Sequence, residues 1–365
     1  MELRTIKIPL VSAFESSIGT EEFKEAVIAI VHKDGVTAYG ECVAGHGPWY
    51  SEETIASANY VICQFLAPLL FKTGITSPQQ FFDLSRNVRG NNMAVACVEM
   101  ALWDLLGKLK EQSISRLIGG EKREVEVGVA VGFQPSVHAL VDKIASFLAD
   151  GYRRIKIKVK PGYDIQPLRA IRERFPHIPL QVDANAAYTL NDLHLLKQLD
   201  EFNLLLMEQP LAHDDLFNHS KLQKQLSTPI CLDESIRSVE IARQAIEIDA
   251  CRIINIKPGR VRGLECSKQI HDLCIRRKIP VWCGGMLETG IGRAFNVALA
   301  SLPGFTLPGD TSASKNYFKK DIITPEFELT NNGTLEVPLG PGIGVQVNEK
   351  LIDSYTVAKN ILTPE

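Results

Sequence analysis

Five charged side chains recur along the middle of the chain at an almost constant interval. They are Lys158, Asp183, Glu208 and Asp233, which stand 25 residues apart, and Lys257, which follows 24 residues later. Because this interval matches one strand-plus-helix unit, we predict that each residue ends a parallel strand and faces a shared site. Three neighbouring carboxylates would repel one another strongly, and a bound divalent cation relieves that repulsion. All-oxygen ligation favours Mg²⁺, with Mn²⁺ as the alternative.

The lysines bracket the carboxylates. Lys156, Lys158 and Lys160 take alternate positions of one predicted strand, so they share a face, and the apolar residues between them should face the helices. We expect the ammonium groups beside the metal site to have lowered pKa values, as a neutral lysine base requires. Lys257 lies on the other side of the carboxylates. The arrangement therefore predicts proton abstraction beside a substrate carboxylate, through an enediolate that the metal and a protonated lysine stabilise.

Other polar residues near these strand ends have simpler interpretations. A single carboxylate at a strand end is often a helix cap, and a lysine triplet is often an exposed edge strand. We predict that Asn185 either forms a turn or supports the metal ligands. Strand alternation points Glu234 away from Asp233, so we leave Glu234 out of the metal set. We expect His213 and His219 to be loop residues.

Short strands that alternate with helices must position these groups. Eight such strands within about 190 residues predict a (β/α)8 barrel of the α/β class. A doubly wound sheet is the alternative. The predicted strands are Glu124–Val131, Arg154–Lys160, Leu180–Asn185, Leu204–Gln209, Ile230–Ser235, Arg252–Lys257, Val281–Gly284 and Phe305–Gly309.

The two ends of the chain differ from this pattern. The region 1–122 predicts an α+β capping domain, with a hairpin over 25–42 and helices at about 52–70, 79–87 and 92–110. We expect the region 123–313 to form the barrel that carries the catalytic site. The tail, 314–365, contains a second hairpin signal at 327–337 and is too small to be a domain, so we expect it to pack back on the cap.

Composition excludes several classes of protein. The chain has 365 residues, 45% hydrophobic and 23% charged, with a net charge of −3. This gives no electrostatic reason to expect nucleic acid or a membrane surface as a partner. The longest nearly apolar stretch, 60–71, is short for a membrane span. Eight cysteines without a CxxC pair predict buried thiols in a cytoplasmic protein.

Longer motifs around these positions resemble those of the enolase superfamily, muconate-lactonising subgroup. The motifs are KIKVKPGYD, VDANAAYT, MEQPL, CLDES, INIKPGRVRG and CGGMLETGIGRA. Within that subgroup, YGECVAGHGPWYSEE and LPGDTSASKNYF resemble the o-succinylbenzoate synthase/N-succinylamino acid racemase family. The likeness runs nearly end to end and implies a barrel with a capping domain. Enolase-type sites combine a lysine or histidine base with Mg²⁺.

The resemblance also implies roles for single residues. Asp183, Glu208 and Asp233 would bind Mg²⁺, Lys158 would be the general base with electrostatic help from Lys156, and Lys257 would stabilise the enediolate or act from the opposite face. Arg260 and Asn185 would support these groups, while Gly284, Gly285 and Met286 would line the substrate pocket beneath a mobile lid loop, Val11–Phe23.

The implied reaction is the dehydration of 2-succinyl-6-hydroxy-2,4-cyclohexadiene-1-carboxylate to 2-succinylbenzoate in menaquinone synthesis. Racemisation of N-succinylamino acids would use the same two lysines. We therefore expect a small-molecule carboxylate substrate and a homo-oligomeric enzyme.

Two alternative functions stay open. The chain could be a metal-binding barrel that serves interaction and not catalysis, or another cycloisomerase of the muconate-lactonising type. Two related groups fit the sequence less well. The chain lacks the histidine that mandelate-racemase-type members carry after strand seven, and it lacks the Asp-x-Asp of dipeptide epimerases. Arg262 stands where a small residue is common in this family, and we expect it to be peripheral.

Overall fold

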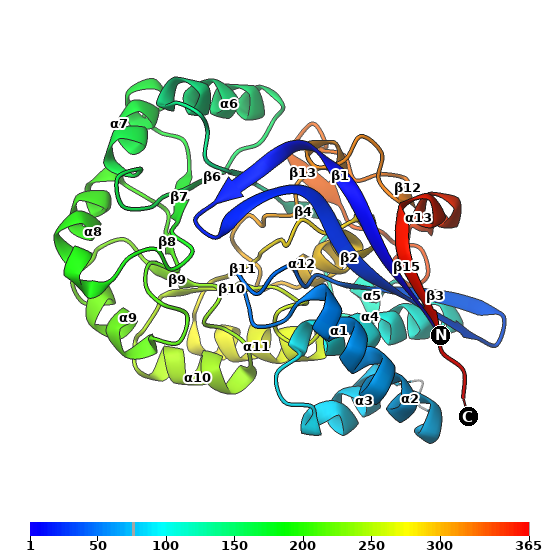
Figure 1. Cartoon of the computed structure of the whole chain (residues 1–365). Coiled ribbons are helices and arrows are strands. Elements are labelled where there is room, and N and C mark those ends of the chain that lie inside the picture. The colour runs from blue at the N-terminus through cyan, green and yellow to red at the C-terminus, as the bar shows by residue number, and fades with distance from the viewer. Residues whose placement is uncertain (75–76, 365) are drawn as a thin grey trace.

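A parallel barrel forms the larger part of the molecule (Figure 1). The computed structural model describes residues 1–74 and 77–364. Within them, parallel strands pair in the order β11-β10-β9-β8-β7-β6-β5, so sequence neighbours lie side by side. This confirms the predicted barrel-type fold over the doubly wound sheet, whose strand order would reverse at a switch point. The strands are β5 (Val129–Val131), β6 (Ile155–Lys158), β7 (Leu180–Asp183), β8 (Met207–Glu208), β9 (Ile230–Leu232), β10 (Ile253–Ile256) and β11 (Val281–Cys283).

Helices cover the outside of the curved sheet, as Figure 1 shows. Most of them bury apolar residues, and several begin at a side-chain cap. Ser238, for example, accepts a hydrogen bond from Ile241 N at 3.2 Å, which satisfies one free N–H of the first turn. The helices are α6 (Val137–Ala149), α7 (Ile165–Arg174), α8 (Leu193–Leu199), α9 (Leu216–Gln223), α10 (Val239–Glu247), α11 (Leu264–Arg277) and α12 (Gly290–Ala300), with 3₁₀ turns η3 (Leu190–Asp192) and η4 (Asp200–Phe202).

The predicted eighth strand, Phe305–Gly309, is not a regular strand. Isolated parallel bridges join Phe305 to Val281 and Gly309 to Val127, so the segment closes the ring with two contacts. Pro308 lacks the N–H that a ladder needs, and Gly309 weakens an extended strand, which explains the irregular closure.

The N-terminal region is an antiparallel sheet covered by helices. The sheet order is β15-β1-β2-β3, and the predicted hairpin is confirmed with His32 opposite Thr37. The predicted helical stretches are confirmed as well. The elements are β1 (Glu2–Ser16), β2 (Gly19–Lys33), β3 (Val36–Cys42), α1 (Ile55–Val61), η1 (Ile62–Leu66), α2 (Ala67–Thr73), α3 (Pro78–Leu84), η2 (Ser85–Asn87), α4 (Asn92–Leu109) and α5 (Ile114–Ile118).

The tail returns to the N-terminal sheet. Its last strand, β15, pairs antiparallel with β1, which places the two termini near each other (Figure 1). The second predicted hairpin is wrong in its first arm, because β13 pairs with β4 at the edge of the barrel and not with 327–330. The remaining elements are β4 (Glu124–Glu126), η5 (Ser314–Asn316), β12 (Ile323–Thr324), β13 (Thr334–Glu336), β14 (Gln346–Val347), α13 (Glu349–Tyr355) and β15 (Thr356–Ile361).

One helical run, Ile55–Lys72, is long and apolar enough to cross a membrane by length and composition alone. It contributes Ile62 and Leu66 to the same apolar cluster as α4. Core helices of folded domains pass the same test, so this run is weak support for a membrane span.

Buried carboxylates join the N-terminal region to the barrel. Glu99 of α4 accepts hydrogen bonds from Leu264 N at 3.0 Å and Glu265 N at 2.9 Å, at the start of α11. Glu41 of β3 accepts one from Thr289 N at 3.0 Å, at the start of α12. Each carboxyl group accepts hydrogen bonds from free N–H groups at the start of a barrel helix. These contacts fix the cap over the barrel.

We predict that Glu99 makes stability depend on pH. Burial raises its pKa from the ordinary 4.5 to about 8, although the backbone hydrogen bonds oppose this shift. A carboxyl group with a raised folded-state pKa contributes stability that is complete below pH 4.5 and is lost as the pH rises toward 8. The unfolding free energy of the wild type minus that of Glu99→Gln should therefore fall between pH 5 and 8, by up to about 1.4 kcal/mol per pH unit.

Denaturant unfolding of both proteins at several pH values measures this difference. Subtracting the variant removes the contribution of every other titrating group. A difference that stays constant over this range would show that Glu99 is ionised in the folded protein throughout.

Candidate active site

Lys158, Asp183 and Glu208 lie side by side on three adjacent strands. Lys158 is the register partner of Asp183, and Asp183 is the register partner of Glu208. All three side chains are buried. Lys158 Nζ donates a hydrogen bond to Asp183 Oδ2 at 2.7 Å. The 25-residue spacing thus corresponds to neighbouring positions at the carboxyl ends of these strands.

Asp233 meets groups from three parts of the chain. Lys257 Nζ donates to Asp233 Oδ2 at 2.8 Å, and the Arg260 guanidinium contacts Oδ1. Arg260 also donates to two backbone carbonyls, at 2.6 and 2.7 Å, which fixes its orientation. The Tyr50 hydroxyl, from the N-terminal region, donates to Asp233 Oδ1 at 3.1 Å and accepts from Lys257 at 3.1 Å. Arg260 therefore contacts the group of charged strand-end residues through Asp233.

Lys156 lies at the centre of the acidic cluster. It donates to Glu208 Oε2 at 2.9 Å, lies 3.3 Å from Asp183 Oδ2 and contacts Asp310 Oδ2. Asp310 in turn accepts from Arg154 at 2.6 Å. Sequence reasoning missed both Asp310 and Arg154. Their position in the sequence could have identified them, since Asp310 directly follows the eighth predicted strand and Arg154 begins the second.

The expected lowering of the lysine pKa values is wrong for Lys156 and Lys257. Burial alone would lower the pKa of Lys156, but attraction to Asp310 and Glu208 raises it. The pKa of Lys257 is also raised, because Tyr50 and nearby carboxylates outweigh the effect of burial. For Asp183, burial opposes ionisation, yet the neighbouring lysines lower its pKa to about 2. For all three groups, attraction between opposite charges outweighs the effect of burial on the pKa.

Asn185 connects Lys158 to a buried carboxylate that the sequence analysis placed elsewhere. Asn185 Oδ1 accepts from Lys158 at 2.6 Å, and its Nδ2 donates to Glu234 Oε1 at 2.8 Å. The prediction that Glu234 faces away is wrong because β9 ends at Leu232, so alternation does not extend to residue 234. Burial and the charge of Asp183 raise the pKa of Glu234 to about 7.

The two histidines take different positions. His213 is exposed in a turn, as predicted. His219 is wrong as a loop residue, because it is buried in α9, where its Nε2 accepts from Leu211 N at 3.2 Å. This burial and the hydrogen bond to the backbone give His219 a structural role.

The chemistry of the carboxylates fits a hard divalent cation. Asp183, Glu208 and Asp233 offer oxygen ligands from consecutive strands. Burial and the charge of Asp183 raise the pKa of Glu208, a repulsion that a cation would relieve. Across residues 1–74 and 77–364, no three His, Cys, Asp or Glu side chains lie close enough together to hold a metal ion. Each carboxylate here contacts a lysine, so metal binding requires the carboxylates to turn toward a common centre.

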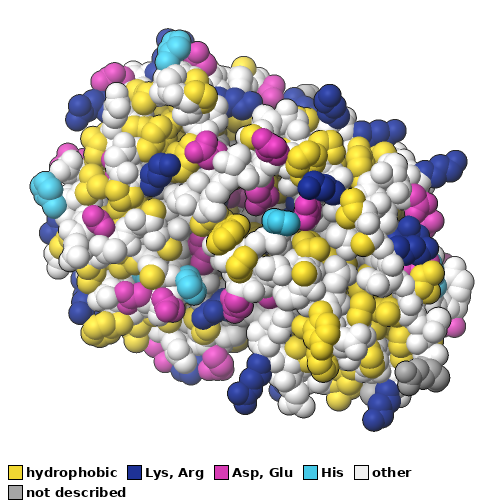
Figure 2. All heavy atoms as spheres, viewed as in Figure 1, with side chains coloured by type: hydrophobic (Ala, Val, Ile, Leu, Met, Phe, Trp, Pro, Cys, Tyr) yellow, Lys and Arg dark blue, Asp and Glu magenta, His cyan; other side chains and the backbone are white. Residues whose placement is uncertain are grey.

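A cavity of about 500 Å³ opens over this ring, between the barrel and the N-terminal sheet. In Figure 2, acidic and hydrophobic side chains surround the hollow near the centre of the view. Lys158 and Lys257 line the cavity, as do Gly285 and Met286. Gly284 lies behind them, and a Cβ there would come within 2.7 Å of Lys257 Cε. A side chain at 284 would therefore displace Lys257.

The hairpin of β1 and β2 forms the cover of the cavity. We predicted a loop over Val11–Phe23, but most of this segment is in the two strands, with Ser16 opposite Gly19 near the tip. Figure 1 shows the hairpin reaching across the barrel. Phe133 N donates to Glu15 O at 2.9 Å, which attaches the hairpin to the barrel. Phe14 and Ile18 line the cavity from this side.

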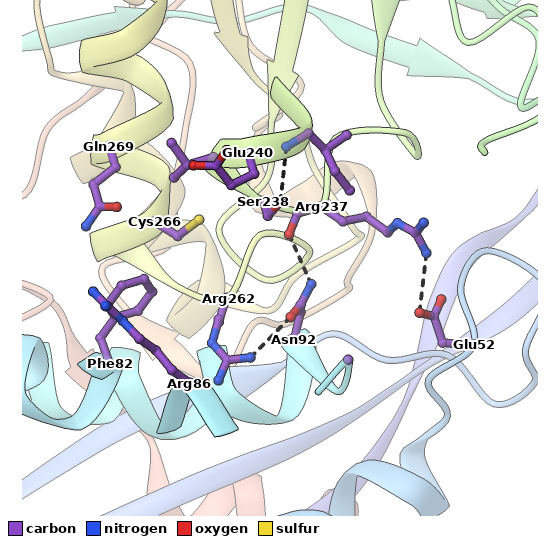
Figure 3. A pocket seen from close by; sticks show the side chains of 13 residues that line it. Glu52, Phe82, Arg86, Asn92, Arg237, Ser238, Glu240, Arg262, Cys266 and Gln269 are labelled. Carbon is purple, nitrogen blue, oxygen red and sulfur yellow. Dashed lines mark hydrogen bonds and ion pairs between the residues drawn. The ribbon is translucent and has the colours of Figure 1, made fainter. Parts of the chain in front are cut away.

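Arg262 lies at a second cavity, between α3, α4 and α10 (Figure 3). We expected it to be peripheral, but it belongs to a set of contacts between the N-terminal region and the barrel that also includes Arg237 and Asn92. Arg262 donates to Val88 O at 3.0 Å and to Asn92 Oδ1 at 3.4 Å, while Asn92 Nδ2 donates to Arg237 O at 3.1 Å. These bonds hold the two regions together, so Arg262 has a structural role.

Comparison with known families matches both regions of the chain. Residues 2–119 match the mandelate racemase/muconate lactonizing enzyme N-terminal domain, and residues 139–351 match the enolase C-terminal domain-like family.

Individual relatives span nearly the whole chain. The o-succinylbenzoate synthase of Geobacillus kaustophilus is 50% identical over 97% of this chain and 94% of its own length. The N-succinylamino acid racemase of an Amycolatopsis species is 45% identical over 98% and 97%. A crystal structure of an enolase-superfamily member from Listeria innocua superposes with a TM-score of 0.94 at 42% identity, covering 98% of this chain and 97% of that one.

Proposed function

Because this chain belongs to the mandelate racemase/muconate lactonizing enzyme family of the enolase superfamily, we propose that it is an o-succinylbenzoate synthase. It would dehydrate 2-succinyl-6-hydroxy-2,4-cyclohexadiene-1-carboxylate to 2-succinylbenzoate. The observation that carries the proposal is the pair Lys158 and Lys257, which line one cavity above three strand-end carboxylates. A protein kept only for interaction needs no such pair.

The lysines and carboxylates divide the chemistry. Neutral Lys158 would take the α-proton of the substrate, and the Lys257 ammonium would stabilise the enediolate charge. The carbon–oxygen bond then breaks, and Lys158 returns its proton to the departing hydroxide, which leaves as water. Asp183, Glu208 and Asp233 would hold Mg²⁺, which supplies positive charge for the substrate carboxylate when bound. Lys156, held by Asp310 and Glu208, adds a fixed positive charge.

An ultraviolet assay of the dehydration tests this proposal. Aromatisation should appear rapidly with Mg²⁺ and stop when a chelator removes the cation. Absence of turnover by folded, Mg²⁺-supplied protein would contradict the synthase assignment.

Racemisation of N-succinylamino acids is the second candidate function. Lys158 ends β6 and Lys257 follows β10, with three strands between them in the sheet order. Two lysines on opposite sides of the substrate carbon could exchange the roles of base and acid, as racemisation requires. The pocket would serve both reactions because each proceeds through an enediolate.

We predict that Arg260→Gln slows racemisation more than dehydration. Arg260 positions Asp233, which in turn holds Lys257. Racemisation requires Lys257 to give and take a proton, whereas dehydration requires only its positive charge, so racemisation depends more on its placement. Values of kcat/KM for both reactions measure the effect. Equal losses in the two reactions would contradict this prediction.

A further inference from the structure

Lys24 is a buried lysine in the wall of the proposed active-site cavity. It belongs to β2, and only 4% of it is exposed. Its Nζ donates one hydrogen bond within the described residues, to Met286 O at 2.9 Å. An ammonium group has three donors, so this lysine has capacity for a further partner.

The other lysines of the cavity differ from Lys24 because each contacts a carboxylate. Lys7 pairs with Glu25 at 3.0 Å, and the three lysines of the ring pair with Asp183, Glu208, Asp233 or Asp310. In the part of the chain that the structure describes, no carboxylate lies within 4.0 Å of Lys24 Nζ.

Glu41 interacts electrostatically with Lys24, but that carboxyl group already accepts other hydrogen bonds. Glu41 accepts hydrogen bonds from Thr289 N, Thr289 Oγ1 and Gly292 N, at 2.6 to 3.0 Å. A buried charge without a close partner is costly. Its retention beside a cavity indicates a group that binds an anion from outside the chain.

Met286 relates Lys24 to the reacting groups. Its carbonyl accepts from Lys24, and its sulfur lies 3.6 Å from Lys257 Nζ. The two lysines thus contact opposite ends of one residue, with Lys24 on the side of the N-terminal sheet. A substrate whose reacting carbon lies beside Lys257 would extend an attached arm toward Lys24.

We propose that Lys24 binds the terminal carboxylate of the succinyl group and so selects succinyl substrates over neutral acyl analogues. This inference rests on the proposed function, in which every substrate carries such a group. Lys24 would act in binding and not in proton transfer. Its removal should therefore raise KM with little change in kcat.

Product binding tests the inference without turnover. Calorimetry with Mg²⁺ compares 2-succinylbenzoate with 2-butyrylbenzoate, which lacks the terminal carboxylate, in the wild type and in Lys24→Met. A charge-assisted hydrogen bond contributes enough that the variant should bind 2-succinylbenzoate about ten- to a hundredfold more weakly. Its affinity for 2-butyrylbenzoate should stay close to that of the wild type.

Two further variants separate recognition from folding. Lys7→Met neutralises the other cavity lysine of the N-terminal sheet and should leave the preference for the succinyl compound intact. Lys24→Arg keeps the charge and should retain most of that preference. Equal weakening of both ligands in Lys24→Met, or full preference in that variant, would overturn the inference alone. If the wild type binds neither ligand, the proposed function falls, and this inference falls with it.

Discussion

A Lys158→Ala variant is expected to lose dehydration and racemisation together, each by about 10²–10⁴-fold, the usual contribution of a general base. Lys158 ends β6 with its ammonium group 2.7 Å from Asp183 and lines the cavity. Lys156 cannot replace it, because ion pairs with Asp310 and Glu208 hold that ammonium group and raise its pKa.

The measurement is kcat for both reactions at saturating Mg²⁺, with thermal unfolding to confirm that the variant is folded. Lys160→Ala is a matched control, since Lys160 continues the same alternation but lies over the Phe133 ring at 4.2 Å. That variant should keep most of its activity. Near-normal turnover by Lys158→Ala would assign the base to another residue.

Racemisation in D₂O adds a readout that a misfolded variant cannot imitate. Lys257 should still exchange the α-proton of one enantiomer in Lys158→Ala, while the other enantiomer stays unlabelled. Exchange of both enantiomers, or of neither, would contradict the division of roles between the two lysines.

The elements that were predicted well are those with strong local signals. The helix over 92–110 has apolar residues at helical spacing, and the hairpin at 25–42 has a glycine turn, so each is specified by nearby residues. The segment 305–309 and the tail hairpin lack this specification. The segment 305–309 closes the barrel against Val127, and β13 pairs with β4, so both partners lie far away in the sequence and leave no local pattern.

The residues of the candidate active site also divide into those with a local sequence signal and those without one. The 25-residue period identified the strand-end residues because each βα unit repeats the same geometry. Tyr50 and Lys24 were missed because they reach the cavity only when the N-terminal sheet docks on the barrel. Glu234 was placed on the wrong side because its orientation depends on where β9 ends, and such boundaries carry weak sequence signals.

The buried acidic residues Glu208 and Glu234 offer the strongest test of the proposed metal ligands. Glu208→Gln should raise the Mg²⁺ concentration for half-maximal activity by at least about 100-fold, since a neutral amide replaces a ligand, and supporting residues alone typically change affinity 10–100-fold. Glu234→Gln should change it by less than about tenfold, because an amide oxygen can still accept the hydrogen bond from Asn185.

Calorimetric titration with Mg²⁺ measures both variants independently of turnover. Both carboxylates are buried, and burial raises the pKa of each, so the substitutions remove a similar desolvation cost and differ in what the carboxylate binds. Glu208 lies in register between Asp183 of β7 and Cys231 of β9, whereas Glu234 contacts Asn185 and reaches Lys158 through it. Equal losses of affinity would make Glu234 a ligand, and a loss confined to Glu234→Gln would remove Glu208 from the metal set.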